Sequence, residues 1–339
     1  MIWLVPPLLA LRQKYPHVKI AVISGTKGVK VLEAFSICDD LFNMKDLLSP
    51  FKIRSWARFF NYFRSELFLN IYGPERGLLF QFLLFPKRVE TSHYHYGVVF
   101  NGKSKERVVF PNRLWVQKFI EFFSDQTFIL NHQANHVSKN IFRFFEMSLN
   151  LTYDSKYCYL EELSRSPQDL PLIILSPFST WKGRNWRIER WLELIQWIRG
   201  EFQDYQIIIF GSAQEKRLYH EILVIDSSVR FIAAKEFKEV LAFTQQAKLV
   251  VANDSMMTHI ASFLGKPSIS LFGPNIPDQF GAISMGSSNL YYPLECSPCR
   301  QGSGNSQCLR GYTTCVGLDE IKLSSVKSHI LSQLEKLEC

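Results

Sequence analysis

The stretch "VVANDSMMTHIASFLGKPSISLFGPN", residues 250–275, decides the fold. Two apolar, strand-like runs in it flank a short helix-like segment, which is the pattern of two parallel strands joined by a crossover helix. Four polar residues stand where the first strand passes into the helix: Asp254, Ser255, Thr258 and His259. A core built only for packing would not need them there, so we expect a ligand site at this strand end.

The same alternation runs through the rest of the second half. Strand-like runs occur at 170–179, 205–210 and 229–234, and "NWRIERWLELIQWIRGEF" (185–202) is the clearest amphipathic helix between them. This order predicts a doubly wound α/β domain with a parallel sheet. A helix over 318–339 is expected to close the chain.

The first half also alternates, but it begins with a helix-like run where such domains normally begin with a strand. The apolar run 18–25, a helix over 27–36 and a short strand at 39–44 follow. The span 51–120 has weak periodicity and defines no elements, and 134–151 reads as a helix. Turn-forming residues at 155–170 predict a domain boundary, which gives two Rossmann-like domains, residues 1–160 and residues 161–339.

The composition excludes disorder and narrows the class of partner. Of the 339 residues 47% are hydrophobic, and the formal net charge is +8. That balance suits an anionic partner such as a phosphorylated small molecule, a membrane surface or nucleic acid. No run reaches the roughly 18 to 20 apolar residues of a membrane span, and the apolar start has no basic residues before it and no cleavage site. We therefore expect a cytoplasmic protein that touches the membrane surface at most.

Four turns at the carboxyl ends of the predicted strands carry the candidate site residues, because ligands of open parallel sheets bind at that edge. The first turn offers hydroxyls and cations for a diphosphate, and the second offers an acid suited to a ribose diol. The third could present helix N–H groups to an anion, and the fourth is a Gly-Pro turn. The residues are Ser179, Thr180, Lys182 and Arg184, then Glu215, then Asp254, Ser255, Met256 and His259, and finally Gly273 and Asn275.

Each of these residues also has a purely structural interpretation. The first turn is compatible with an ordinary solvated loop, and Glu215 with compensation of a helix dipole. Asp254 is a good helix N-cap, and a lone histidine such as His259 is more often structural than functional. The coincidence of four such turns at one sheet edge favours a binding site.

Seven cysteines are present, and four of them cluster near the C-terminus as Cys296, Cys299, Cys308 and Cys315. Their number and spacing are compatible with a structural Zn²⁺ site, although the second pair is wider apart than in common zinc knuckles. The alternative is a set of free or redox-labile thiols. An odd total does not indicate a secreted disulfide framework.

The motifs in this order resemble glycosyltransferase family nine, the lipopolysaccharide heptosyltransferases. The similar stretches are "SPFSTWKGRNWRIERWLELI", "IIIFGSAQE", "NDSMMTHIASFLGKPSISLFGPN" and the cysteine-rich "CSPCRQGSGNSQCLRGYTTC", together with "VPPLLALRQKYPHVKIAVISG" in the first half. The resemblance covers most of 1–45 and 170–330.

The resemblance implies a GT-B fold, in which two Rossmann-like domains face each other across a cleft. The second domain would bind a nucleotide-sugar, ADP-heptose in characterised members. Lys182 would contact the diphosphate and Glu215 the ribose, with Asp254 and Ser255 at the start of the diphosphate-binding helix and His259 supporting it. The reaction would be an inverting transfer to a lipid-linked core oligosaccharide at the inner membrane surface, without a metal or other cofactor.

Three positions depart from the family pattern. Met1 stands where the family has its catalytic Asp, Met256 replaces a glycine and Asn275 replaces a threonine. The first departure leaves two expectations: a chain whose start is truncated or misassigned, or a non-catalytic nucleotide-sugar-binding remnant without the general base. A third hypothesis, nucleic-acid binding through the positive charge, has no recognisable module in its favour.

Overall fold

The computed structural model of the chain divides into two compact units, Met1–Tyr157 and Cys158–Cys339. The structure describes residues 2–49, 51–62, 65, 68–70, 89–94, 126–130, 136–152, 171–179, 181–212, 215–216, 229–233, 236–284, 286–297, 299, 308 and 311–338.

The first unit starts with a short helical turn and a helix, followed by a two-stranded parallel sheet. Pro6 and Pro7 lie in the first turn of the helix, as expected, because proline lacks the N–H that this position leaves unpaired anyway. Phe42, Leu47 and Phe59 form a small buried core under the sheet. The elements are η1 (Ile2–Leu4), α1 (Val5–Lys14), β1 (Ala21–Ser24), α2 (Thr26–Glu33), β2 (Asp40–Asn43), α3 (Met44–Leu47) and α4 (Ile53–Phe60).

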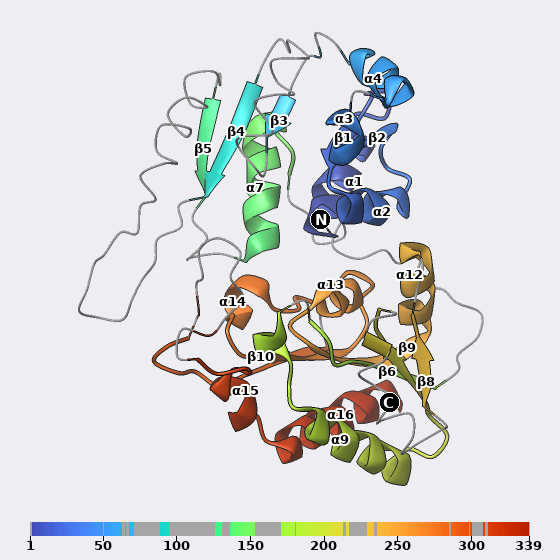
Figure 1. Cartoon of the computed structure of the whole chain (residues 1–339), viewed down its shortest axis with the longest axis vertical. Helices are drawn as coiled ribbons and strands as arrows, with labels where there is room; N and C mark the ends of the chain where they lie inside the picture. Colours follow the sequence, from blue (N-terminus) through green and yellow to red (C-terminus); the bar gives the residue numbers. More distant parts are fainter. Residues whose placement is uncertain are drawn as a thin grey trace. The chain divides into compact units, whose positions relative to one another are not determined.

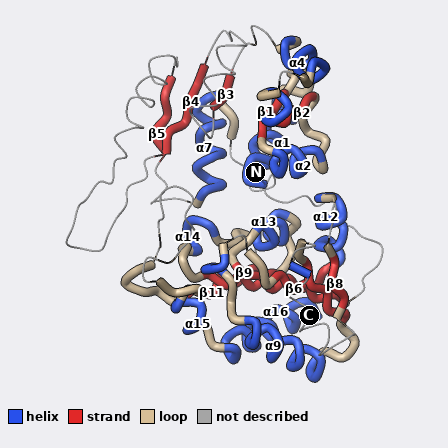
Figure 2. The backbone as a smooth tube through the Cα atoms, viewed as in Figure 1, coloured by secondary structure: helices blue, strands red, loops and turns tan. Residues whose placement is uncertain are grey.

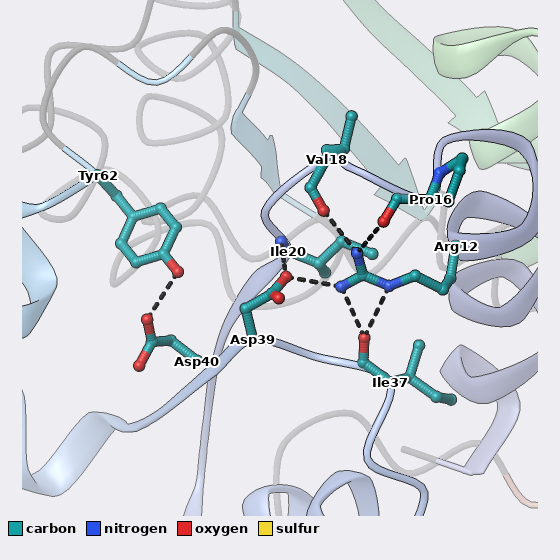
Figure 3. Close-up of polar contacts among 8 residues, drawn as sticks. All are labelled: Arg12, Pro16, Val18, Ile20, Ile37, Asp39, Asp40 and Tyr62. Carbon is teal, nitrogen blue, oxygen red and sulfur yellow. Dashed lines mark hydrogen bonds and ion pairs between the residues drawn. The ribbon is translucent and has the colours of Figure 1, made fainter.

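The guanidinium of Arg12 joins the end of α1 to the segments around β1 and β2 (Figure 3). It donates to three backbone carbonyls and to one carboxylate, those of Pro16, Val18, Ile37 and Asp39. The same Asp39 oxygen accepts the N–H of Ile20 at 2.7 Å. Burial alone would raise the pKa of Asp39, but the hydrogen bonds from Ile20 and Arg12 and the guanidinium charge together hold it below its usual range.

A second parallel sheet of the first unit has the order β3-β4-β5 (Figure 2). Helix α7 follows and packs against η1 and α1, with the rings of Trp3 and His136 edge to face at 5.1 Å. The elements are β3 (Phe68–Asn70), β4 (Val89–Tyr94), β5 (Gln126–Leu130) and α7 (Val137–Leu149).

The second unit is built on a six-stranded sheet in which every pairing is parallel. Its strands are β6 (Leu172–Ser176), β7 (Gln206–Phe210), β8 (Arg230–Ile232), β9 (Ala247–Asn253), β10 (Ser268–Phe272) and β11 (Ser287–Tyr291). Its helices are η3 (Lys182–Arg184), α9 (Ile188–Glu201), α12 (Phe237–Gln246), α13 (Met256–Phe263), α14 (Pro277–Phe280), α15 (Val316–Glu320) and α16 (Leu323–Glu338).

The strand order β11-β10-β9-β6-β7-β8 reverses once, between β6 and β9. The second unit begins with β6 in the middle of the sheet and proceeds outward through β7 to β8 at one edge. The chain then returns to place β9 beside β6 and continues through β10 to β11 at the other edge. Ser176 of β6 is paired with Ala252 of β9, so the carboxyl ends of these two strands lie next to each other. In doubly wound sheets the crevice outside such a reversal is where ligands bind.

Apolar layers on both faces hold this sheet in place. Helices α9 and α16 lie on one side of it, and α12 and α13 lie on the other (Figure 1). Trp191 and Ile198 of α9 share a fully buried core with Ile330 of α16 and the inward side chains of the central strands. Because both faces are covered, strands such as β6 (LIILS) are continuous apolar runs without a polar alternation, whereas β10 (SISLF) buries two serines between its apolar residues.

The elements expected from the apolar runs are confirmed in both units, with ends shifted by a few residues, except that the single helix expected over 318–339 is divided into α15 and α16. Strand β11 was not predicted, since "SSNLY" is half-buried at the sheet edge and has no apolar run. The unplaced span 51–120 contains α4, β3 and β4. No helix of the described part of the chain combines the length and the apolar character that a membrane span requires.

Replacement of Arg12 by lysine tests how far the first unit depends on this guanidinium. A lysine ammonium cannot reproduce the forked set of hydrogen bonds, so Arg12→Lys should lower the free energy of unfolding by about 1–3 kcal/mol. Urea unfolding measures the loss, and Arg54→Lys, at an exposed arginine of the same unit, is the matched control. Equal losses in the two variants would contradict the assigned role.

Candidate functional site

The carboxyl edge of the second sheet brings three segments together at the reversal between β6 and β9. They are the loop 177–187 after β6, Asp254 and Ser255 after β9, and the turn 273–276 after β10. Hydrogen bonds and one ion pair connect all three, so the segments form one connected arrangement.

Asn253, the last residue of β9, holds the loop after β6 in place. Its side chain is fully buried. Its amide nitrogen donates to the carbonyl of Pro177, and its amide oxygen accepts the N–H of Trp186 at 3.2 Å. The two ends of the loop are thereby fixed to one strand end.

Asp254 connects the loop after β6 with the turn after β10. Its side chain is only 3% exposed. One carboxylate oxygen accepts the side-chain amide of Asn275 at 2.6 Å and lies 3.4 Å from Nε of Arg184. Burial raises the pKa of Asp254, and the Arg184 charge and the Asn275 hydrogen bond counteract this only in part. The carboxyl is therefore held by its neighbours and is not available as a solvent-exposed base.

Arg184 is the cation that the structure places in this cluster. Its guanidinium carbon lies 5.3 Å from the centre of the Trp181 ring. Its Nε is buried and makes no hydrogen bond, although Asp254 is near enough for an ion pair. The tight turn also needs Gly183, since a Cβ there would come within 2.9 Å of the Trp181 Nε1. An ion pair on one side and an aromatic face on the other keep the guanidinium in a defined place.

Lys182, to which the family resemblance assigned the diphosphate contact, is exposed and pairs with none of the described carboxylates. The two cations are two positions apart in the 3-10 turn η3. At three residues per turn, such neighbours point in different directions. The sequence could not say which of them faces Asp254: Arg184 was named as a second cation of this turn, but the specific diphosphate contact was assigned to Lys182.

The start of α13 differs from the expectation in one respect. The N-cap is Ser255, whose hydroxyl accepts the N–H of Met257 at 3.3 Å, so the assignment of Asp254 as N-cap is wrong. Met256 is the first helical residue and is 49% exposed. Thr258 is buried and donates to the carbonyl of Asn253, which makes it structural. His259 lies half-buried on the same helix.

Gly273 and Ser179 have structural roles that are visible in the contacts. A Cβ on Gly273 would lie 2.7 Å from Leu318 Cγ, so glycine is required there for α15 to approach. The N–H of Ser179 donates to the side chain of Asn185 at 2.8 Å, which braces the loop after β6. Thr180 lies outside the described residues.

Glu215 makes a reciprocal pair of hydrogen bonds with Ser212. Its carboxylate accepts the N–H of Ser212, and its own N–H donates to the Ser212 hydroxyl. This is the pattern of a capping box, in which serine and glutamate three residues apart close a helix start. The capping interaction uses one of the two carboxylate oxygens of Glu215. A contact between Glu215 and a ribose stays a prediction.

The four clustered cysteines lie beside the same loops. Cys296, Cys299, Cys308 and Cys315 all line one pocket, together with Trp181 and Pro274. The N–H of Cys299 donates to the carbonyl of Pro274 at 2.7 Å, and that of Cys315 to the carbonyl of Gly183 at 3.2 Å. Among the described residues no group of three or more His, Cys, Asp or Glu side chains is placed to hold a metal. The described residues thus give the structural zinc site no support, and the backbone bonds of Cys299 and Cys315 brace the adjoining turns.

Comparison with known proteins relates this arrangement to one family. The model of glycosyltransferase family 9 (heptosyltransferase) matches residues 115–309, which is more than half of the chain. The lipopolysaccharide heptosyltransferase 2 of Salmonella typhimurium is 30% identical over 115 residues, 32% of each chain. The lipopolysaccharide heptosyltransferase 1 of Pseudomonas aeruginosa is 24% identical over 139 residues, 41% of this chain and 39% of the relative. The matches thus span 32% to 39% of the length of these curated relatives.

Two solved structures share the fold over nearly the whole chain. The ADP-heptose lipopolysaccharide heptosyltransferase II of E. coli has a TM-score of 0.70 and 16% identity, covering 100% of this chain and 96% of that one. A family 9 glycosyl transferase from Veillonella parvula has a TM-score of 0.71 and 16% identity, covering 99% and 94%. The α/β fold of the GT-B type is thereby confirmed. On its sequence match and its fold, the chain belongs to glycosyltransferase family 9 (heptosyltransferase).

Proposed function

We propose that the protein is a glycosyltransferase that binds a nucleotide-sugar on its second unit and transfers the sugar to a lipopolysaccharide core acceptor. The donor in this proposal is ADP-heptose, and no metal or other cofactor takes part. Family membership supports the reaction class. A structural neighbour from E. coli was solved with ADP, and another with ADP-2-deoxy-2-fluoro heptose, at TM-scores of 0.69 and 0.65.

The observation that carries the proposal is the position of Arg184 beside the start of α13, at the strand-order reversal. A diphosphate needs cations and N–H donors directed at one point. Ser255 satisfies the N–H of Met257, which leaves the N–H groups of Met256 and Thr258 among those without a partner inside the helix. The guanidinium of Arg184 lies next to Asp254, the residue that directly precedes the N-cap of α13. Lys182, on the exposed side of the same turn, adds a mobile charge.

In the proposed reaction this cluster stabilises the departing diphosphate. Negative charge grows on the diphosphate as the bond to the sugar breaks, and prearranged donors stabilise it without having to reorganise. Asp254 cannot also remove the acceptor proton, since it is buried and engaged by Arg184 and Asn275. Its role in the proposal is to hold the guanidinium in place, with His259 supporting the helix and Glu215 contacting the ribose.

Met256 is the residue of the site expected to shape what the donor pocket accepts. Its exposed side chain stands at the first position of α13, where the family pattern has glycine. In the proposal this side chain crowds the sugar of the donor, which ADP lacks, so Met256→Gly should tighten binding of the complete donor and leave that of ADP unchanged. Calorimetric titration with both ligands measures this, and equal affinities of wild type and variant for both would contradict it.

Titration with ADP tests the donor site and decides between the two cations. Loss of a charged hydrogen bond costs about 1.5–3 kcal/mol, so Arg184→Ala should weaken ADP binding by at least about tenfold. Lys182→Ala should have a smaller effect, and Lys238→Ala, at an exposed lysine of the same unit, should have none. A larger effect of Lys182→Ala would return the role to that residue, and unchanged affinity in all three variants would refute the site.

Asp254→Asn tests the buried carboxyl through pH. Because the folded-state pKa is raised above the unfolded value of about 3.9, deprotonation of Asp254 costs stability as pH rises through the interval between the two pKa values. The variant lacks this loss, so its melting temperature relative to wild type should increase across that interval from pH 4 upward. The exposed Asp278→Asn serves as control. A constant difference at all pH values would mean that the carboxyl does not titrate as expected.

A transfer assay with ADP-heptose and a purified core acceptor tests the reaction itself. Release of ADP that depends on the acceptor, and that falls in Arg184→Ala, is the expected result. Donor binding without transfer would instead favour the non-catalytic nucleotide-sugar-binding protein, and neither binding nor transfer would refute both.

A further inference from the structure

Residues 45–60 of the first unit expose an unusual concentration of large apolar side chains. We call this region the α3–α4 surface. Of the eleven exposed large hydrophobic residues in the described part of the chain, four lie within it: Leu48, Phe51, Ile53 and Phe60. Phe51 is 89% exposed and Ile53 is 74% exposed. Scattered apolar residues on a surface need no explanation, but these four lie on α4 and on the turn that joins it to α3, two helices that contact each other, and such a concentration indicates a contact with a partner.

Helix α4 separates its side chains into three stripes. Phe59 points inward and is buried against Phe42 and Leu47. Ile53, Ala57 and Phe60 are spaced i, i+4 and i+7, so they share a second face, and all three are exposed. The ring of Phe60 stacks on that of Trp56 at 5.7 Å, which fixes the end of this apolar face.

The third stripe is basic. Arg54 and Arg58 are four residues apart and therefore neighbours on the helix, beside the apolar face. Residues 45–60 hold four basic side chains and one acidic side chain. Arg58 pairs with Asp40, and Lys52 lies 3.9 Å from Asp46. Arg54 is exposed and pairs with none of the described carboxylates.

We infer that the α3–α4 surface docks on an anionic lipid bilayer. An apolar face bordered by lysine and arginine is the arrangement of helices that lie in a membrane interface, with the rings among the acyl chains and the cations at the headgroups. A second copy of the chain is the less suitable occupant, because a two-fold contact would bring the same cations against each other. The inference does not depend on the proposed donor site.

Co-sedimentation of the full chain with lipid vesicles tests the inference. Wild type should bind vesicles of phosphatidylethanolamine and phosphatidylglycerol, bind pure phosphatidylcholine far more weakly, and lose affinity as salt is raised. Removal of the two most exposed side chains, in Phe51→Ser with Ile53→Ser, should lower the partition coefficient by at least about tenfold. Arg54→Gln should lower it about fivefold, and on anionic vesicles only.

The matched control is Met147→Ser, which removes an apolar side chain of α7, 41% exposed, in the same unit. Its vesicle binding should equal that of wild type, and thermal melts should show all variants folded, since the replaced side chains face solvent. Absence of vesicle binding by wild type would overturn the inference, as would equal binding by the Phe51 and Ile53 double variant. A dimer in light scattering that the double variant converts to monomer, without vesicle affinity, would assign the surface to a second copy.

Discussion

The side-chain amide of Asn253 is the contact on which the site of the second unit depends. It is fully buried, and both its oxygen and its nitrogen form hydrogen bonds with the loop after β6. A buried amide that loses a partner costs about 1–3 kcal/mol, so the loop is held to this strand end by more than its own packing. Arg184 lies between the two attachment points, and its nearness to Asp254 follows from them.

Burial of Asp254 sets the electrostatics around this attachment. A carboxylate removed from water is costly unless it is paired, and here one guanidinium and one amide supply the pairing. The same guanidinium keeps donors directed away from Asp254, because a planar fork with five N–H groups is not saturated by a single oxygen. One residue can thus stabilise a buried acid and still face an anion. The braces from Pro274 to Cys299 and from Gly183 to Cys315 keep the surrounding backbone in register with it.

The sequence predicted the sheet well and the site only in part. Buried parallel strands such as β6 and β9 are continuous apolar runs, so they could be recognised without their neighbours. Strand β11 could not, because an edge strand with half-buried serines has no such run. The polar residues after β9 pointed to the region of the candidate site, but the individual contacts within it could not be predicted. Whether Ser255 or Asp254 caps α13, and whether Lys182 or Arg184 turns inward, depends on backbone geometry that residue types do not encode. The demand for glycine at Gly273 comes from Leu318, far along the chain.

The contact between Asn253 and Pro177 also bears on how the protein is made. These residues are 76 positions apart, so the loop after β6 leaves the ribosome long before the strand that will hold it. The central strands β6 and β9 can pair only once the intervening segment has been synthesised, and such non-local parallel pairing forms slowly. During that interval β6 can pair with β7, but its other edge waits for β9, and such an uncovered apolar strand edge is prone to aggregate or recruit chaperones. Because the first strand of this sheet is a central one, newly synthesised chains are prone to aggregate until β9 has been translated.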